Sequence, residues 1–340
     1  MSILIDNDIS SADNLYEVPI VLIILLSCCY GMISLTAIVG NFCVLLIVAI
    51  SRRMRTVTNY FIANLAVADI VIGLFCIPFQ FQAALLQRWV LPPFMCAFCP
   101  FVQVLSVNVS VFSLAAIALD RYRAVIYPLK AKTSKVSAKW IIVCIWIFSG
   151  ISGMPYAIAL RVTLIDTDTG NFSKPFCHNV GIPTPIWNIY NHALVCLQYF
   201  VPLSLISMMY IRIGLKLKDT KTPGNREGIR DDVILKNKKK VIHMLFVVVT
   251  LFGICWLPLQ SYNILQEVLP QINKYKYINI IWFFCHWLAM SNSCYNPFIY
   301  AIYNERFKSE FRNRFGCCNK IFRLQHKDQK SLDSLSSRYA

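Results

Sequence analysis

Long apolar blocks separated by short polar stretches dominate the chain. The first block without a charged residue, 18–50, runs for 33 residues, and a bilayer core about 30 Å thick needs roughly 20 helical residues to cross it. Lipid offers no hydrogen-bond partners, so each crossing segment must satisfy its own backbone as a helix. Seven blocks are long enough, at about 20–50, 57–86, 94–119, 140–160, 193–214, 241–265 and 277–303. The pattern predicts an all-α membrane protein, a seven-transmembrane helix bundle.

Composition excludes the soluble classes of protein. Of the 340 residues, 57% are hydrophobic and 15% are charged, whereas about 25% of a soluble domain is charged. The unbroken apolar runs also exclude an outer-membrane barrel, whose strands alternate in short segments. We expect an N-terminus at 1–19 without the basic region of a cleaved signal, and the bundle at 20–303. A short amphipathic surface helix at 304–318 and a disordered tail at 319–340 complete the expected organisation.

The basic residues lie mostly on one side of the expected bundle. The loops after the first, third and fifth spans and the tail, counted together with Arg212 at the end of the fifth span, hold 28 of the 33 Lys and Arg residues. The positive-inside rule then places the tail in the cytosol and the N-terminus outside the cell, in a multi-pass protein of the plasma membrane. The net charge of +16 is spread over short loops that face an anionic leaflet. We therefore expect contacts with membrane lipids and no nucleic-acid binding.

Two cysteines face the oxidising side in this topology. Cys96 lies at the start of the third span and Cys177 in the loop between the fourth and fifth, which predicts one disulfide between them. Asn171 opens a glycosylation sequon in the same loop. On the other side, Cys317 and Cys318 follow a basic amphipathic stretch, and they are candidate palmitoylation sites.

One carboxylate, that of Asp69, lies within a span and away from its ends. An ionised group at that depth costs about 3 kcal/mol or more, which makes Asp69 a functional candidate. Polar residues of other spans are available as its partners, namely Asn41, Ser110, Asn292 and Asn296. Such a group of oxygen atoms suits a small cation such as sodium, or a proton. The alternative is a hydrogen-bond cluster that only joins helices.

Further motifs mark the cytosolic half. Asp120-Arg121-Tyr122 follows Cys96 by 24 residues, about 36 Å of helix, and therefore emerges at the cytosolic face. Asp120 and Arg121 can pair there, and a partner protein can break the pair. A proline removes a backbone hydrogen bond and kinks a helix. We expect kinks or breaks in five spans, at Pro78, Pro155, Pro202, Pro258 and Pro297.

Polar residues follow one face of the sixth span in its outer half. Trp256, Gln260, Asn263 and Glu267 are spaced i, i+4, i+7 and i+11, which places them on one side of a helix. If the outer polar residues of the other spans converge on this face, they line an outward-open cavity with one acidic residue, Glu267. The alternative is that the amides only bridge helices. The polar residues from the other spans are Gln103, Gln198 and His286.

Taken together, these motifs resemble the rhodopsin-like (class A) G-protein-coupled receptors over residues 41–318. The resemblance rests on Gly40-Asn41, Leu65-Ala66-Val67-Ala68-Asp69, Cys96, Asp120-Arg121-Tyr122, Trp146, Pro202 with Tyr210, Cys255-Trp256-Leu257-Pro258, and Asn296-Pro297 with Tyr300. It implies a sodium pocket formed by Asp69, Ser110, Trp256, Asn292 and Asn296. It also implies an activation switch, whose residues rearrange when the sixth span swings outward. The switch residues are Asp120, Arg121, Tyr122, Tyr210, Phe252, Trp256, Pro258, Pro297 and Tyr300.

The chain departs from this resemblance at Lys238. Some relatives carry an acidic residue there, which closes a lock with the residue that corresponds to Arg121. Two positive charges repel each other, so the restraint on the inactive state must come from elsewhere, with Asp120 as a candidate.

The resemblance also reduces the number of ligand classes to be considered. Amine receptors carry Asp where this chain has Gln103, and opsins carry a buried Lys where it has Met290. The stretch 98–112 is most similar to invertebrate RYamide (luqin-type) receptors, within the neuropeptide Y-like and RF-amide group. This implies an amidated peptide whose penultimate Arg meets Glu267, with tachykinin-, SIFamide- or RFamide-type peptides as alternatives. The candidate ligand-binding residues are Gln103, Gln198, Gln260, Asn263, Glu267 and His286.

The expected partners follow from the same resemblance. They are an amidated peptide, a heterotrimeric G protein, and receptor kinases and arrestin. The kinases would act on the tail serines Ser331, Ser334, Ser336 and Ser337, and the alternative is that these serines only belong to a disordered tail. No catalytic residue is expected, and no cofactor beyond an allosteric sodium ion. The alternative from another class, an intramembrane serine protease at Ser152, lacks a base, since the histidines assigned to the spans, His243 and His286, lie near opposite faces. A transporter would show paired broken helices in repeated halves, which are absent.

Overall fold

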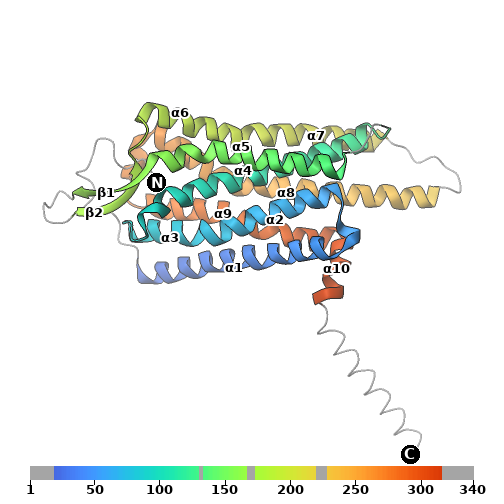
Figure 1. The fold of residues 1–340 in the computed structure, drawn as a ribbon, viewed down its shortest axis with the longest axis horizontal. Helices are drawn as coiled ribbons and strands as arrows, with labels where there is room; N and C mark the ends of the chain where they lie inside the picture. Colours follow the sequence, from blue (N-terminus) through green and yellow to red (C-terminus); the bar gives the residue numbers. More distant parts are fainter. Residues whose placement is uncertain (1–18, 130–132, 167–172, 220–227, 316–340) are drawn as a thin grey trace, which may run out of the picture.

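The computed structural model describes residues 19–129, 133–166, 173–219 and 228–315, which form a bundle of long helices (Figure 1). A two-stranded hairpin lies at one end of the bundle and α10 turns away at the other; we call these the hairpin end and the α10 end. The helices are α1 (Ile20–Ile50), α2 (Val57–Phe75), α3 (Ile77–Leu86), α4 (Pro93–Ile126), α5 (Lys135–Ala159), α6 (Thr184–Val195), α7 (Val201–Asp219), α8 (Gly228–Val268), α9 (Ile278–Tyr303) and α10 (Glu305–Phe315).

The predicted seven-helix bundle is confirmed. Six helical segments among the described residues are long and apolar enough to cross a membrane, at Ile20–Ile50, Val57–Leu86, Pro93–Ile126, Lys135–Ala159, Thr184–Leu217 and Lys240–Val268. The seventh, α9, has 26 residues and packs against α1 and α8. Its hydropathy is lower because it carries polar residues, and these are buried in the bundle: His286, Ser291, Asn292, Ser293 and Asn296.

Several helices extend further than the apolar blocks predict. The third span was expected to end near 119, but α4 continues to Ile126, so Asp120-Arg121-Tyr122 lies inside its last two turns. α5 begins at Lys135, where the Ser134 hydroxyl caps the helix by accepting from the Ser137 N–H at 3.0 Å. α8 begins at Gly228, well before the expected 241. Backbone hydrogen bonding and capping, rather than apolar composition, decide where a helix ends.

The prolines act in different ways. The second span breaks at Cys76, and Pro78 lies in the first turn of α3. The fifth span contains a π-helical turn, η3 (Cys196–Phe200), immediately before Pro202. A break at Pro155 was wrong, because α5 continues through it to Ala159. Pro258 and Pro297 likewise lie inside continuous helices, since neighbouring groups can satisfy the carbonyl that a proline frees.

The hairpin is fixed over its end of the bundle at two points. β1 (Leu160–Asp166) pairs antiparallel with β2 (Ser173–Asn179), and Val162 lies opposite Cys177. Cys177 is disulfide-bonded to Cys96 at the start of α4, which confirms the predicted disulfide. The Trp89 N–H donates to the Pro175 carbonyl oxygen at 2.6 Å and holds the chain after α3 against β2.

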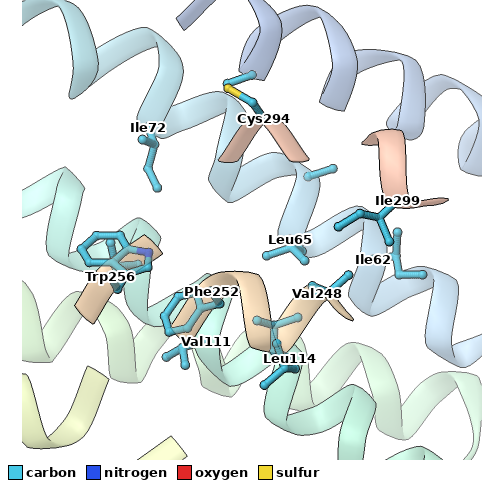
Figure 2. Close-up of a cluster of buried hydrophobic side chains, with 14 of the residues drawn as sticks. Ile62, Leu65, Ile72, Val111, Leu114, Val248, Phe252, Trp256, Cys294 and Ile299 are labelled. Carbon is cyan, nitrogen blue, oxygen red and sulfur yellow. The ribbon is translucent and has the colours of Figure 1, made fainter. Parts of the chain in front are cut away.

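Close packing holds the middle of the bundle together (Figure 2). Phe252 and Trp256 of α8 lie beside Val111 of α4. The ring centroids of Phe252 and Trp256 are 5.9 Å apart. Because lipid is as apolar as these side chains, tight contact rather than the hydrophobic effect joins the helices. Gly40 of α1 illustrates this requirement. A Cβ atom at this position would lie only 3.0 Å from Cγ of Pro297 in α9, so a larger residue would push the two helices apart.

A chain of buried hydrogen bonds joins three helices. Trp146 Nε1 of α5 donates to Asn64 Oδ1 of α2 at 2.8 Å. Asn64 Nδ2 donates to Ser113 Oγ of α4, also at 2.8 Å, and Ser113 Oγ donates to the Val109 carbonyl oxygen at 2.6 Å. Lipid supplies no substitute for a lost partner, so these bonds tie α2, α4 and α5 together.

Candidate functional site

A cavity of about 210 Å³ opens at the hairpin end, between α3, α4, α6, α8 and α9. Cys177 of the hairpin and Trp256 of α8 both contribute to its lining. The predicted polar residues converge on it, and their role in ligand binding stays a prediction. All six candidate ligand-binding residues line this cavity: Gln103, Gln198, Gln260, Asn263, Glu267 and His286.

A hydrogen-bonded chain of uncharged groups forms one wall. Gln80 Nε2 of α3 donates to Gln103 Oε1 of α4 at 2.6 Å. Gln80 Oε1 lies 3.2 Å from His286 Nε2, and the other ring nitrogen, Nδ1, lies 3.1 Å from the Tyr30 hydroxyl. Both nitrogens of His286 are therefore engaged by the protein, and the ring holds Gln80 against Gln103 rather than offering a free group to the cavity.

The opposite part of the cavity is acidic. The Glu267 side chain is only 10% exposed, and His192 Nδ1 lies 3.0 Å from its Oε2 atom. The same Nδ1 atom lies closer, 2.8 Å, to the Asn188 carbonyl oxygen, and Glu267 Oε2 accepts no hydrogen bond from the described residues. A nearly buried carboxylate oxygen without a donor favours a cationic hydrogen-bond donor in the cavity.

A π-helical turn helps to shape the floor of the cavity. Gln198 and Tyr199 of η3 are buried. Gln198 Nε2 is 3.4 Å from the Val104 carbonyl oxygen, and the Tyr199 hydroxyl donates to the Gly253 carbonyl oxygen at 2.8 Å. The π-helical turn thus directs Gln198 toward α4 and Tyr199 toward α8. Such turns occur frequently at functional sites.

Sequence reasoning missed Gln80, Asn191 and His192, which also line the cavity. Gln80 follows the helix break at Cys76, so its direction did not follow from the spacing within the second span. Asn191 and His192 precede the predicted fifth span, which was placed at 193. The helix begins at Thr184 instead, and His192 lies in its last turn. Pro183 and Pro185 around the first helical residue are the signal that indicates this start.

The middle of the bundle contains the buried carboxylate of Asp69. Asn296 Nδ2 donates to its Oδ2 atom at 2.9 Å. Among the described residues, Asp69 Oδ1 and Ser110 Oγ have no hydrogen-bond partner, nor has Trp256 Nε1. Asn292, one turn before Asn296, is also buried. The unpartnered oxygen atoms match the ligands that hard cations prefer.

Asn41 is not a direct partner of Asp69. Its Nδ2 atom donates to the backbone carbonyl oxygens of Ala37 at 2.9 Å and Ser293 at 2.8 Å. Asn41 therefore joins α1 to the α9 backbone beside the carboxylate, and its contribution to the Asp69 cluster is indirect.

At the α10 end, Arg121 is held by α4 itself and by α2. Its Nη2 atom donates to Asp120 Oδ2 at 2.8 Å and to the Thr58 hydroxyl. Thr58 Oγ1 also donates to Asp120 Oδ2, at 3.0 Å. The expected pairing of Asp120 with Arg121 is thus present, together with Thr58, which the sequence did not indicate.

Two tyrosines of the predicted activation switch lie deep in the packed core. Tyr210 of α7 and Tyr300 of α9 are both buried, and the Tyr300 hydroxyl has no partner among the described residues. The Tyr300 ring lies 5.7 Å from that of Phe307 in α10. The inward end of α10 is therefore packed against the end of α9.

The family comparison agrees with this geometry. The family of seven-transmembrane receptors of the rhodopsin type matches residues 40–300. The chain belongs to the rhodopsin family of seven-transmembrane receptors. It is consequently a multi-pass membrane protein, and the family resemblance seen in the sequence is confirmed.

Individual relatives are peptide receptors by name. The chain is 34% identical to the tachykinin-like peptides receptor 99D of Drosophila melanogaster, over 93% of the chain and 62% of that receptor. It is 36% identical to the RYamide receptor of Tribolium castaneum, over 83% of the chain and 78% of the receptor. The RYamide receptor of Drosophila melanogaster is 38% identical, over 83% of the chain and 61% of the receptor. The chain thus spans less than two thirds of two of these relatives.

Membership of a receptor family rejects the protease alternative. The geometry around Ser152 agrees. Its hydroxyl donates to the Ser149 carbonyl oxygen at 2.9 Å and accepts from Asn108 Nδ2 at 2.6 Å. These neighbours supply no base, so in this rhodopsin-family chain Ser152 joins α4 to α5.

The surface helix after the last span is present as α10. Asn304 Oδ1 accepts from the N–H groups of Arg306 and Phe307, at 3.2 and 3.3 Å, and so caps its start. Other predictions fall outside the described residues: glycosylation at Asn171, palmitoylation at Cys317 and Cys318, the tail serines Ser331, Ser334, Ser336 and Ser337, and the N-terminus before residue 19. The side chain of Lys238 is likewise not described.

Proposed function

We propose that this receptor lies in the plasma membrane with its hairpin end outside the cell. There it binds an amidated neuropeptide of the RYamide or neuropeptide Y-like class, and its α10 end activates a heterotrimeric G protein. The observation that carries the proposal is the composition of one cavity, which combines the uncharged Gln80–Gln103 pair with the Glu267 carboxylate, whose Oε2 atom accepts no hydrogen bond from the described residues. No cationic partner from the described residues neutralises that carboxylate by a hydrogen bond.

Glu267 is the proposed partner of a ligand arginine. A guanidinium presents several N–H donors to a carboxylate, and a charge-assisted bond of this kind is worth about 1.5–3 kcal/mol. The side chain is 10% exposed, so the bond would form largely out of water. An arginine next to the C-terminus of the peptide would lie at this part of the cavity.

Gln103 is the proposed partner of the peptide's terminal amide. A primary amide both donates and accepts hydrogen bonds, and so does the glutamine side chain. Gln103 lies seven residues after Cys96, about 10 Å further into the bundle. A free-acid terminus would bring an unpaired negative charge to this uncharged wall, which is unfavourable away from water.

The names of the relatives support a peptide ligand but do not choose between two groups. RYamide receptors and a tachykinin-like peptides receptor match at similar identity. We favour the RYamide class because Glu267 supplies a partner for an arginine. A tachykinin-type peptide is the second candidate, since the 99D receptor matches over 93% of the chain.

We further propose that a sodium ion binds at Asp69 in the inactive receptor. Asp69 Oδ1 and Ser110 Oγ, both without partners, would be oxygen ligands, with Asn292 and Asn296 beside them and Trp256 above. The ion would supply a positive charge that offsets the buried carboxylate. Agonist affinity would then fall as sodium rises, because the two favour different states.

At the proposed cytosolic face, the switch centres on Arg121. Agonist binding would favour a state in which the arginine leaves Asp120 and Thr58, and the end of α8 moves outward to admit the G protein. The tail serines are the proposed sites for receptor kinases, whose added charge would recruit arrestin. Membrane lipids would contact the exposed apolar faces of the bundle.

A ligand screen tests the function. Cells that express the full chain would be exposed to amidated RYamide-, RFamide-, SIFamide- and tachykinin-type peptides and to biogenic amines, with calcium and cAMP as readouts. We expect RYamide-type peptides to act at the lowest concentration. Activation by an amine while every amidated peptide is silent would overturn the proposal.

A further inference from the structure

His192 and Glu267 face each other across the cavity wall, from α6 and α8. His192 Nδ1 lies 3.0 Å from Glu267 Oε2 and 2.8 Å from the Asn188 carbonyl oxygen. A ring nitrogen placed between two oxygen acceptors carries a hydrogen, because a bare lone pair would be repelled by both. A second proton must therefore bind at the other ring nitrogen, Nε2.

Nε2 is accessible to that proton. The His192 side chain is 45% exposed, and no described residue forms a hydrogen bond with Nε2. Imidazole is the side chain whose ordinary change of charge falls between pH 5 and 8. Proton uptake therefore creates a cation 3.0 Å from a carboxylate that is 10% exposed, where little water screens the interaction.

The other groups of the cavity do not compete for this role, and the second histidine of the lining, His286, has both ring nitrogens engaged by Tyr30 and Gln80. Tyr156 of α5 lines the same cavity as Glu267, and its hydroxyl donates to Asn191 Oδ1 at 3.1 Å. Phenols are neutral between pH 5 and 8. On α8 itself, the cavity neighbours Asn263 and Gln266 carry no charge. Of the described residues, only His192 forms an ion pair with Glu267.

We propose that His192 is a built-in, proton-dependent counterion of Glu267 that competes with the cationic group of the ligand. This inference rests on the proposed function, because it requires a ligand cation at Glu267. At acidic pH the imidazolium occupies the carboxylate, and the ligand arginine must displace it. At neutral pH the carboxylate is open. Ligand binding at acidic pH then releases one proton, so affinity falls as pH falls.

Equilibrium binding at two pH values tests the competition. The probe is a radiolabelled, N-acetylated peptide that ends in Arg-Tyr-amide, bound to membranes that contain the full chain. Competition with one proton raises Kd by up to tenfold for each unit by which the pH falls, so we expect a clear rise in Kd between pH 7.5 and pH 5.5. His192→Gln should show the same Kd at both values. His178→Gln, which changes a hairpin histidine paired with Thr163, should retain the rise seen in the wild-type receptor.

Two results would overturn the inference. The first is a pH dependence that is equal in the wild-type receptor and His192→Gln. The second comes from a ligand-free measurement, in which NMR of ¹³C-labelled imidazoles follows the ionisation of His192 in the purified receptor. Glu267→Gln removes the facing charge and should change the pH at which the His192 signals shift, and no change would contradict the pairing. If this pH changes but the probe binds at no pH, the proposed function fails while the counterion stands.

Discussion

Lys240 Nζ lies 2.5 Å from Glu305 Oε1, and this ion pair joins the α10 end of α8 to the first turn of α10. The bond from Lys240 lowers the pKa of the Glu305 carboxyl. Arg121, by contrast, is bound to Asp120 and Thr58, and among the described residues it forms no hydrogen bond or ion pair with α8. We therefore expect the Lys240–Glu305 pair to restrain the sixth span, in addition to Asp120, which the sequence had suggested.

Reversing one charge of this pair should raise ligand-independent signalling. In Glu305→Lys, two positive charges face each other, and the end of α8 is repelled from α10. We expect basal signalling to rise about two- to fivefold, as an exposed pair has a modest energy. The double variant Lys240→Glu/Glu305→Lys should return to the wild-type level. The measurement is basal second-messenger production normalised to surface expression.

A matched control uses another acid of α10. Glu310 pairs with Arg314 of the same helix and accepts from Ser51, and among the described residues it forms no ion pair or hydrogen bond with α8. Glu310→Lys should leave basal signalling unchanged. An equal rise in Glu310→Lys and Glu305→Lys would show that net charge, and not the Lys240 contact, causes the effect.

The Asp69 carboxylate should confer sodium sensitivity. Asp69→Asn removes the negative charge but keeps the size and the contact with Asn296. We expect 100 mM sodium chloride to weaken agonist binding several-fold in the wild-type receptor and to have no effect in Asp69→Asn, with N-methylglucamine chloride as the ionic-strength control. If sodium weakens agonist binding equally in the wild-type receptor and Asp69→Asn, the sodium ion does not act at Asp69.

Asn64 should matter for stability rather than for ligand selectivity. Asn64→Ala removes both 2.8 Å hydrogen bonds and leaves Trp146 Nε1 without its acceptor. We expect a loss of about 1–3 kcal/mol, seen as a lower midpoint for thermal unfolding of the detergent-purified receptor. Ser204→Ala, which removes a bond within its own helix, should change the midpoint little. No shift in Asn64→Ala would contradict the structural role of this chain of bonds.

Gln103 should determine the preference for an amidated C-terminus. The wild-type receptor should respond to the amidated peptide at least tenfold more potently than to its free acid, and Gln103→Ala should reduce this ratio because the amide loses its partner. Gln266→Ala, in the same cavity, serves as the control and should keep the ratio. If the potency ratio between the amidated peptide and its free acid is unchanged in Gln103→Ala, the terminal amide does not bind at Gln103.

The bundle was predictable because spanning a membrane imposes length and apolar composition on each segment. The disulfide followed from Cys96 and Cys177 sharing one side of the membrane. The helix ends did not follow: α4 runs past Asp120 and α6 begins at Thr184. Backbone hydrogen bonds and caps decide those ends, and polar residues continue a helix outside the lipid without an apolar signal.

The site was predictable where a regular helix fixes the direction of side chains. Gln260, Asn263 and Glu267 follow from the helical period, and all line the cavity. Gln80 and His192 did not follow, because one lies after the break at Cys76 and the other lies before the apolar block. The engagement of His286 with Tyr30 and Gln80 also depends on contacts between helices, which no single-span pattern contains.

The most direct test of the account is a double-mutant cycle between Glu267 and the ligand arginine. Agonist Kd would be measured for the wild-type receptor and Glu267→Gln, each with the Arg-Tyr-amide peptide and with its citrulline analogue, at pH 7.5. Each single change should weaken binding at least tenfold. The two together should be no worse than either alone, a coupling of about 1.5–3 kcal/mol. If the fold losses in affinity from the two single changes multiply when the changes are combined, Glu267 and the ligand arginine do not interact. That result would contradict the proposed mode of recognition.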